Sequence, residues 1–315
     1  MSDRYEELDL GRVKPVSISE RGSKVTLESF GEPRKGGKSF RKWLEALPDG
    51  LAADRIKNLA LAMRRCKSAK DREFVWMIGA HVVKCGLSLY LIELMKKGYV
   101  TVLSMNGAAA IHDFEIACFG ETSEDVAANL ARGIFGFSRE TSDGMSGAVS
   151  AAAGGASGLG EALGAYLTRE RSPNRSYSLL AEAYRLGIPA TVHVAIGTDI
   201  LVQHPDFDGA VWGGLSARDF RIFAARIERL GLRGGVALNI GSAVIMPEVF
   251  LKAFGVARNL GASFDNITTC NLDMIQHYRP AENVLKRPSQ FGGESIAITG
   301  HHEILIPLLY STLFS

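Results

Sequence analysis

The sequence is short of cysteine, of net charge and of long apolar runs, and each shortage excludes a class of protein. Its four cysteines in 315 residues form no Cys-X-X-Cys pair and are too few for a disulfide scaffold. The formal net charge of +2 supplies no basic domain, so no nucleic-acid partner is expected. No uncharged apolar run approaches the roughly 18 residues of a membrane span, and the N-terminus lacks a secretory signal. We therefore expect a cytoplasmic protein with reduced thiols and no membrane partner.

The sequence does have enough hydrophobic residues, 46% of the chain, to build a large core. Short apolar runs rich in β-branched or aromatic residues predict buried strands. Six such runs occur, at 73–79, 99–105, 188–196, 234–242, 264–270 and 295–300. Stretches with apolar residues at helical spacing separate most of them. This alternation predicts an α/β fold with an open, mostly parallel sheet and helices on both faces.

Residues 1–66 are predicted to be an appendage of an irregular arm followed by helices at 39–47 and 51–66. The arm either orders against the body or a neighbouring subunit, or is a disordered tail. Residues 67–315 are expected to form one domain. Within it, the Gly-, Ala- and Ser-rich segment 144–166 predicts close helix packing at a domain or subunit contact. Its glycines at 158–164 superficially resemble a phosphate-binding loop, but no predicted strand precedes them.

Small and polar residues follow most of the predicted strands, where ligands bind in an open α/β sheet. Glycines at such positions let backbone N–H groups approach a phosphate, and an aspartate there can bind a ribose diol. The pattern predicts a dinucleotide or similar ligand. The alternatives are that the glycines only serve turns and that Asp113 and Asp199 only cap helices. The strand-end groups are Gly79-Ala80-His81, Asn106 to Asp113, Gly197-Thr198-Asp199, Gly241-Ser242-Ala243, Asn271-Leu272-Asp273 and His301-His302-Glu303.

Metal and nucleophile sites are less clearly indicated. His301 and His302 are adjacent and would point in opposite directions on a strand, and the other histidines show no zinc spacing, so no metal is expected. Cys270 could be a nucleophile, but a buried cysteine is usually inert packing. The irregular segment 273–293 contains Lys286, which is either a surface lysine or, in a dry pocket beside another cation, a nucleophile toward imines.

Four segments together resemble the deoxyhypusine synthase family, including its bacterial deoxyhypusine synthase-like members. The likeness extends over about residues 70–135 and 180–315, and its motifs occur in the family's order. The four segments are VWMIGAHVVKCGLSLYLIELMKKGYVTVLSMNGAAAIHDFEIACFGETSEDV, GVALNIGSAVI, RPAENVLKRP and ITGHHEILIPLL.

The resemblance implies a Rossmann-like fold, NAD as cofactor and a homotetramer. It also implies transfer of an aminobutyl group from spermidine to an acceptor amine through a lysine imine. The acceptor is a protein lysine in deoxyhypusine synthases and putrescine in related homospermidine synthases. A third possibility is a non-catalytic homologue that binds NAD or polyamine.

Site residues follow from the resemblance position by position. Lys286 is the implied nucleophile, although it fits only with a local gap of two positions. Glu282 matches a polyamine-binding glutamate, His112 takes the place of another family glutamate, and Asp273 and Glu115 are acidic groups expected to favour a cation. The implied NAD contacts are Asn106, Gly107, Ala108, Asp199, Gly241, Ser242, Thr269, Cys270, His301 and His302.

Overall fold

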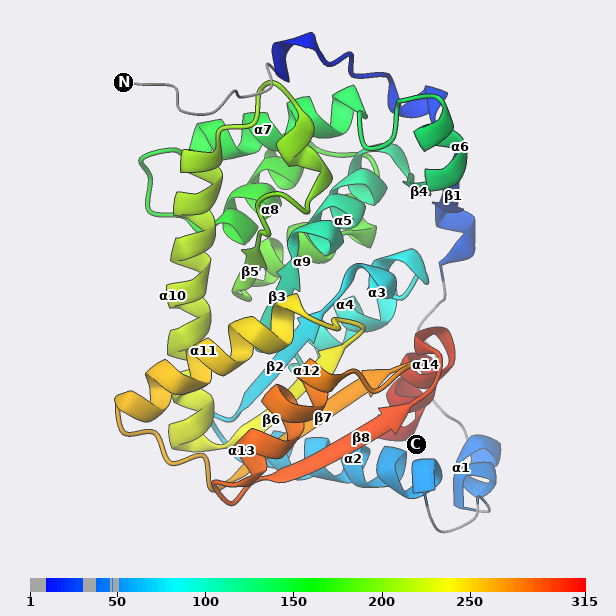
Figure 1. The fold of residues 1–315 in the computed structure, drawn as a ribbon. Helices are drawn as coiled ribbons and strands as arrows, with labels where there is room; N and C mark the ends of the chain where they lie inside the picture. The colour runs from blue at the N-terminus through cyan, green and yellow to red at the C-terminus, as the bar shows by residue number, and fades with distance from the viewer. Residues whose placement is uncertain (1–9, 31–37, 46, 48–50) are drawn as a thin grey trace.

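A six-stranded, fully parallel sheet lies at the centre of the fold, in the order β5-β3-β2-β6-β7-β8 (Figure 1). The computed structural model describes all residues except 1–9, 31–37, 46 and 48–50. The six predicted strands and the α/β class are confirmed. The strands are β2 (Glu73–Ile78), β3 (Val102–Asn106), β5 (Ala190–His193), β6 (Gly235–Ile240), β7 (Ile267–Asp273) and β8 (Glu294–Thr299).

The strand order creates one topological switch point. The chain runs outward from β2 through β3 to β5, then returns to place β6 on the other side of β2 and continues outward through β7 to β8. The loops that leave β2 and β6 therefore diverge, which is where ligands bind in doubly wound folds. Some predicted strand boundaries were wrong by three residues. The strand expected over 188–196 ends at His193, and the strand expected to end at Cys270 continues to Asp273, because residues 271–273 pair with 297–299 of β8.

Helices cover both faces of the sheet, as predicted. Alternate residues of β2 enter two separate apolar clusters, with Trp76 on one face and Met77 on the other, and every residue of the strand is buried. The helices are α1 (Lys38–Glu45), α2 (Leu51–Ser68), α3 (Ala80–Lys84), α4 (Ser88–Lys96), α5 (Gly107–Phe119), α6 (Val126–Ala131), α7 (Arg139–Ala152), α8 (Leu159–Arg169), α9 (Leu179–Leu186), α10 (Gly209–Arg233), α11 (Ile245–Asn259), α12 (Tyr278–Pro280), the π-helix η6 (Ala281–Lys286), α13 (Arg287–Ser289) and α14 (His302–Leu313).

One face of the sheet is covered mainly by α2, α4, α5, α8, α9 and α14, and the other by α10, α11 and η6. None of these described helices is long and apolar enough to cross a membrane.

The N-terminal arm packs on the body of its own chain over residues 10–30. Its strand β1 (Ser23–Thr26) pairs antiparallel with β4 (Glu121–Glu124), and Val16 bridges to Ser138. The backbone N–H of Ile18 also donates to the Glu140 carboxylate at 2.9 Å. The disordered-tail alternative is therefore wrong for this part of the arm. The predicted irregular stretches at 1–9 and 31–37 lie outside the described residues.

The glycine-rich segment forms α7 and the first part of α8, and its glycines allow close packing within the chain. A Cβ at Gly160 would lie 2.2 Å from the Ala190 carbonyl oxygen, so a larger residue would displace β5. The carboxylate of buried Asp219 accepts hydrogen bonds from Gly160 N (2.9 Å) and Val192 N (2.7 Å). The Asp219 carboxylate thus occupies the start of α8, the position where a phosphate-binding loop would bind the phosphate of a ligand.

Candidate functional site

Two glycines join the carboxyl ends of β2 and β6 at the switch point. Gly79 N donates to the Ile240 carbonyl at 2.9 Å, and a Cβ at Gly79 would come within 2.0 Å of the Gly241 oxygen. Gly241 has a φ of +66° and lies against His302, whose Cε1 would be 2.8 Å from an added Cβ. Backbone contact and a left-handed conformation therefore both require glycine here. The turn interpretation of Gly241 is confirmed.

The carboxyl ends of β3 and β5 bring four predicted cofactor contacts together. Asn106 caps α5 by accepting from Ala109 N at 2.9 Å. Next to it, a Cβ at Gly107 would lie only 2.1 Å from Asp199 Oδ2, so the glycine lets the carboxylate approach the first turn of α5. That carboxylate accepts from Ala195 N at 2.9 Å and does not cap the short helix after it. Burial raises the pKa of Asp199.

A cavity of about 180 Å³ opens beside this turn and carries both signs of charge. Ala108 and Asp199 border it on one side. Lys84, from the end of α3, reaches it from another, and residues of the N-terminal arm and β4 complete the wall. The lining residues are Arg21, Lys84, Ala108, Ile111, His112, Glu115, Ser123, Glu124, Val126, Phe135, Thr198, Asp199 and Ile200. Ser123 has a φ of +64°, a strained value for a serine, at this wall.

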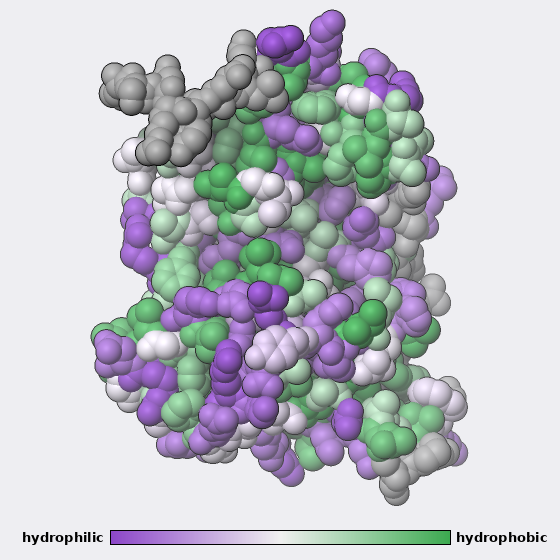
Figure 2. All heavy atoms as spheres, viewed as in Figure 1, coloured by the Kyte–Doolittle hydropathy of each residue, from purple (hydrophilic) through white to green (hydrophobic). Residues whose placement is uncertain are grey.

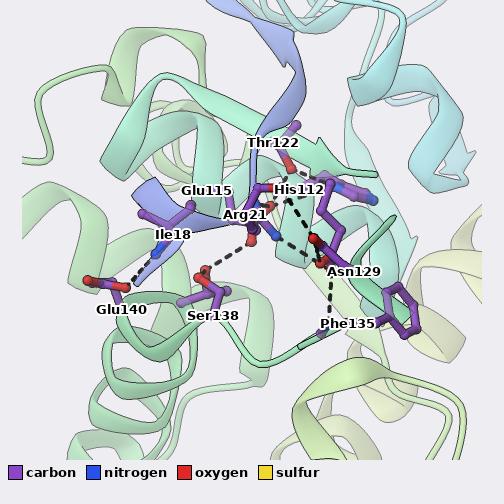
Figure 3. Close-up of polar contacts among 12 residues, drawn as sticks. Ile18, Arg21, His112, Glu115, Thr122, Asn129, Phe135, Ser138 and Glu140 are labelled. Atoms are coloured by element: carbon purple, nitrogen blue, oxygen red, sulfur yellow. Dashed lines mark hydrogen bonds and ion pairs between the residues drawn. The ribbon is translucent and has the colours of Figure 1, made fainter. Parts of the chain in front are cut away.

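Two of the three carboxylates in the wall are paired with Arg21 of the arm, and Figure 3 shows Arg21 pointing toward Glu115. Arg21 Nη2 lies 2.8 Å from Glu115 Oε2, and Nη1 lies 3.8 Å from Glu124 Oε1, with all three side chains buried. Thr141 Oγ1 also donates to Glu115 at 2.9 Å, and Asn129 donates to Glu124 at 2.7 Å. Glu115 therefore lies at the predicted site, but its charge is compensated by Arg21. Sequence reasoning missed Arg21 because the arm carried no periodic pattern.

His112 lies in the same wall as a neutral side chain. Its Nδ1 is 2.6 Å from Thr122 Oγ1, and burial, with Lys84 and Arg21 nearby, lowers its pKa to about 3. It can therefore donate or accept one hydrogen bond but adds no charge to the cavity at neutral pH.

Asp113 is not part of the cavity wall. Its carboxylate accepts from Ser178 Oγ (2.6 Å), Leu179 N (2.6 Å) and Leu180 N (3.0 Å), which caps the start of α9. Burial raises its pKa to about 6. The expectation that Asp113 caps the helix that follows its strand was wrong, because Asp113 lies inside that helix, α5, and instead holds the start of α9.

Thr269 and Cys270 do not reach the carboxyl edge. Both are buried in the middle of β7, because the strand continues to Asp273. Thr269 Oγ1 is 3.2 Å from Ser295 Oγ near the start of β8, and burial raises the pKa of the Cys270 thiol far above its usual range. Their positions are those of core residues, so the expectation that they lie at the end of a strand was wrong.

Lys286 and Glu282 form an exposed pair on η6. Lys286 Nζ lies 3.0 Å from Glu282 Oε1, and 67% of the lysine side chain is exposed. The backbone carbonyl of Leu285, the residue before Lys286, accepts a hydrogen bond from Ser295 Oγ at 2.7 Å, so Lys286 lies near the amino end of β8. Because a strand rises about 3.3 Å per residue, the whole length of β8 separates Lys286 from the carboxyl edge of the sheet. Polar side chains gather over α11 to α13 on this face (Figure 2).

The first turn of α14 brings further groups to the switch point. Buried His302 places Nε2 3.1 Å from the Leu272 carbonyl and 3.8 Å from Asp273 Oδ1, and burial lowers its pKa. Exposed His301 lies 3.8 Å from Glu303. Ser242 is buried and accepts from Met246 N at 3.1 Å, which holds the turn after β6.

The sequence analysis placed His81 and Glu303 at separate strand ends and did not predict that they lie together with Cys85 of the α3 region. The only signal in the sequence was the spacing of four residues between His81 and Cys85, which puts both on one side of a helix.

No family model matches the chain, and no curated protein matches it. Solved structures do share its fold. The ternary complex of AgrE with ornithine and NAD+ is 17% identical with a TM-score of 0.54, covering 89% of this chain and 34% of that one. A candidate LOR/SDH protein from Methanococcus maripaludis S2 is 15% identical with a TM-score of 0.52, covering 96% and 76%.

A deoxyhypusine synthase candidate from Entamoeba histolytica is 12% identical with a TM-score of 0.50, covering 89% of this chain and 96% of that one. This chain spans about a third of the length of AgrE. At these identities the likeness establishes the fold, which is Rossmann-like, as the resemblance implied.

Proposed function

We propose that this protein is an enzyme that binds NAD at the carboxyl edge of its sheet and uses it to oxidise a small basic amine. The single observation that carries the proposal is the contact of Asp199 with Gly107 beside the switch point. An aspartate at the carboxyl edge can bind the ribose hydroxyls of NAD. Because Gly107 has no side chain, the backbone N–H groups at the start of α5 stay accessible to a phosphate. A fold shared with an NAD+ complex of AgrE supports the same assignment.

The residues present fit the cofactor. Asn106 holds the start of α5, Gly107 leaves room for the carboxylate, and Asp199 borders the 180 Å³ cavity. NAD, when bound, would supply a hydride acceptor for the carbon that carries the amino group. The protein's part is to orient the amine and to exclude water at that edge.

The specific reaction that we propose is transfer of an aminobutyl group from spermidine to an acceptor amine, either putrescine or a protein lysine. Two lysines are candidates for the imine. Lys286 matches the family position, but in this chain it lies near the amino end of β8, so it would act at the site of a neighbouring subunit in a homotetramer. Lys84 shares the cavity with Asp199 in the same chain, near the cationic Arg21.

Reductive trapping tests this reaction. The protein is incubated with spermidine and NAD, reduced with borohydride, digested and mapped by mass spectrometry. Lys286→Ala and Lys84→Ala are compared, with Lys252→Ala as a matched control, because Lys252 is an exposed helical lysine paired with Glu248. A mass adduct on Lys286 or Lys84 supports the transfer. NADH production without any adduct would leave oxidation but refute a lysine imine, and NAD binding without either would indicate a binding protein.

A second candidate substrate is a basic amino acid such as ornithine. The cavity wall carries a lysine, Lys84, with no ion-pair partner among the described residues, and it faces the same cavity as Asp199. Such a pair of opposite charges suits a carboxylate and an ammonium group on one ligand. AgrE, which shares the fold, was crystallised with ornithine as well as NAD+. Comparing NADH formation with ornithine, spermidine and putrescine separates the two candidates. Lys84→Met should raise the KM for ornithine, whereas in aminobutyl transfer the same variant should lose the lysine adduct if Lys84 forms the imine.

A further inference from the structure

Three side chains with metal-ligand chemistry converge beside the switch point, and the proposed function uses none of them. A ring nitrogen of His81, the sulfur of Cys85 and a carboxylate oxygen of Glu303 all lie within 4.8 Å of one another. Cys85 Sγ donates to Glu303 Oε2 at 3.7 Å. His81 and Cys85 are four residues apart, and Cys85 N donates to the His81 carbonyl at 2.9 Å, so both side chains leave the same side of one helical turn.

A fourth group beside this cluster lacks a partner. His302 is fully buried, and its ring centroid lies 5.4 Å from that of His81. Nε2 faces the Leu272 carbonyl and therefore carries the proton, which leaves Nδ1 as an acceptor. That Nδ1 is buried and has no hydrogen-bond partner among the described residues. A buried acceptor without a partner is costly, and a bound ion or a water held by that ion would satisfy it.

We propose that His81, Cys85 and Glu303 bind a divalent transition-metal ion of the zinc class, with His302 Nδ1 accepting a hydrogen bond from the ion's water. One imidazole, one thiolate and one carboxylate are donors that zinc accepts together, whereas magnesium and calcium select oxygen atoms alone. Three protein ligands with the fourth position open is the arrangement of catalytic rather than structural zinc sites.

The surrounding backbone holds the cluster in place. The β2 turn at Gly79 presents α3, and Gly241, which has no side chain, allows His302 to lie over the end of β6. His81 lies in α3, which follows β2, and His302 and Glu303 lie in α14, which follows β8. The ion would therefore lie at the same edge of the sheet as the proposed NAD site, close enough to the switch point to polarise a substrate oxygen or nitrogen. The site does not depend on the identity of that substrate.

Cobalt binding to the 315-residue chain tests the proposal. Purified protein is stripped with a chelator and titrated with Co²⁺, then with Zn²⁺ as competitor, with stoichiometry checked by elemental analysis. We expect one equivalent to bind and to give both the visible bands of a four-coordinate ion and a near-ultraviolet thiolate band. Cys85→Ser should abolish the thiolate band, and His81→Ala and Glu303→Gln should each weaken binding at least about tenfold.

Matched controls keep the outcome interpretable. Cys66→Ser changes another partly buried thiol, and His277→Ala changes a histidine outside the cluster, so both should bind as the unsubstituted protein does. Circular dichroism confirms folding of each variant, and NAD binding is measured separately. Cobalt that fails to bind, or that binds equally to Cys85→Ser, overturns the metal site and leaves the NAD proposal standing. Cobalt binding in a protein that does not bind NAD would support the metal site and overturn the NAD proposal.

Discussion

Replacing Arg21 with methionine should destabilise the protein by about 3–5 kcal/mol, because the buried Glu115 carboxylate then loses its cation. Only 3% of the Arg21 side chain and none of the Glu115 side chain is exposed, and their charged atoms are 2.8 Å apart. Threonine hydroxyls remain as partners, but they donate hydrogen bonds without compensating the charge. Glu124, 3.8 Å from the same guanidinium, loses its cation too.

The free energy of unfolding, from urea denaturation at neutral pH, measures this loss. Arg12→Met is the matched control, because Arg12 lies in the same arm but is exposed and should change stability by less than about 0.5 kcal/mol. The double variant Arg21→Met, Glu115→Gln should recover much of the loss, since a neutral amide needs no cation. A loss below about 1 kcal/mol in Arg21→Met, or no recovery in the double variant, would show that the pair does not compensate a buried charge.

Three further substitutions test other parts of the structure. Gly107→Ala should weaken NAD binding at least about tenfold, because the added Cβ would lie 2.1 Å from Asp199 Oδ2. Gly214→Ala is the control, because open space surrounds Gly214 and its NAD affinity should not change. Equal NAD affinities of the two variants in calorimetry would count against the assignment of Gly107 to the NAD site. Glu282→Gln should weaken spermidine binding more than NAD binding, and equal losses of both, or none, would remove Glu282 from the polyamine site. Asp219→Asn should flatten the fall in stability with rising pH. Burial raises the Asp219 pKa to about 7, so its folded form binds more protons than the unfolded form between about pH 4 and 7, and stability is lost as pH rises through that window. The difference should approach about 4 kcal/mol, and parallel stability curves would refute it.

The fold could be predicted because its signals are local. Each central strand is a short apolar run, and Phe74 to Ile78 read as a strand whatever lies beside them. The boundary error at the end of β7 arose at Asn271 and Asp273, whose polar side chains interrupt the apolar run although their backbones pair with β8. Strand pairing is a non-local property that polarity alone does not encode.

The site was only partly predictable because its decisive contacts join distant segments. Asn106 and Gly107 could be predicted to lie at the carboxyl edge of the sheet from their place at the end of a strand, since that rule depends on topology alone. The charge state of Glu115 depends on an arginine from the arm, and no periodic pattern in the arm signals that pairing. His81 and Glu303 are brought together only because α14 begins over the ends of β6 and β7.

The contact between the glycines at the switch point bears on how the sequence of this protein can change over evolution. A side chain at Gly79 would enter the backbone of Gly241, and one at Gly241 would enter His302. Both positions are therefore closed to substitution by internal packing, Gly79 by the backbone of Gly241, and Gly241 by the His302 side chain and its own positive φ. A related protein that bound no cofactor would keep both glycines for the same reason, so their retention in related sequences would indicate the fold and not nucleotide binding. Under the NAD proposal the informative position is Gly107, whose neighbour is the Asp199 carboxylate rather than a strand.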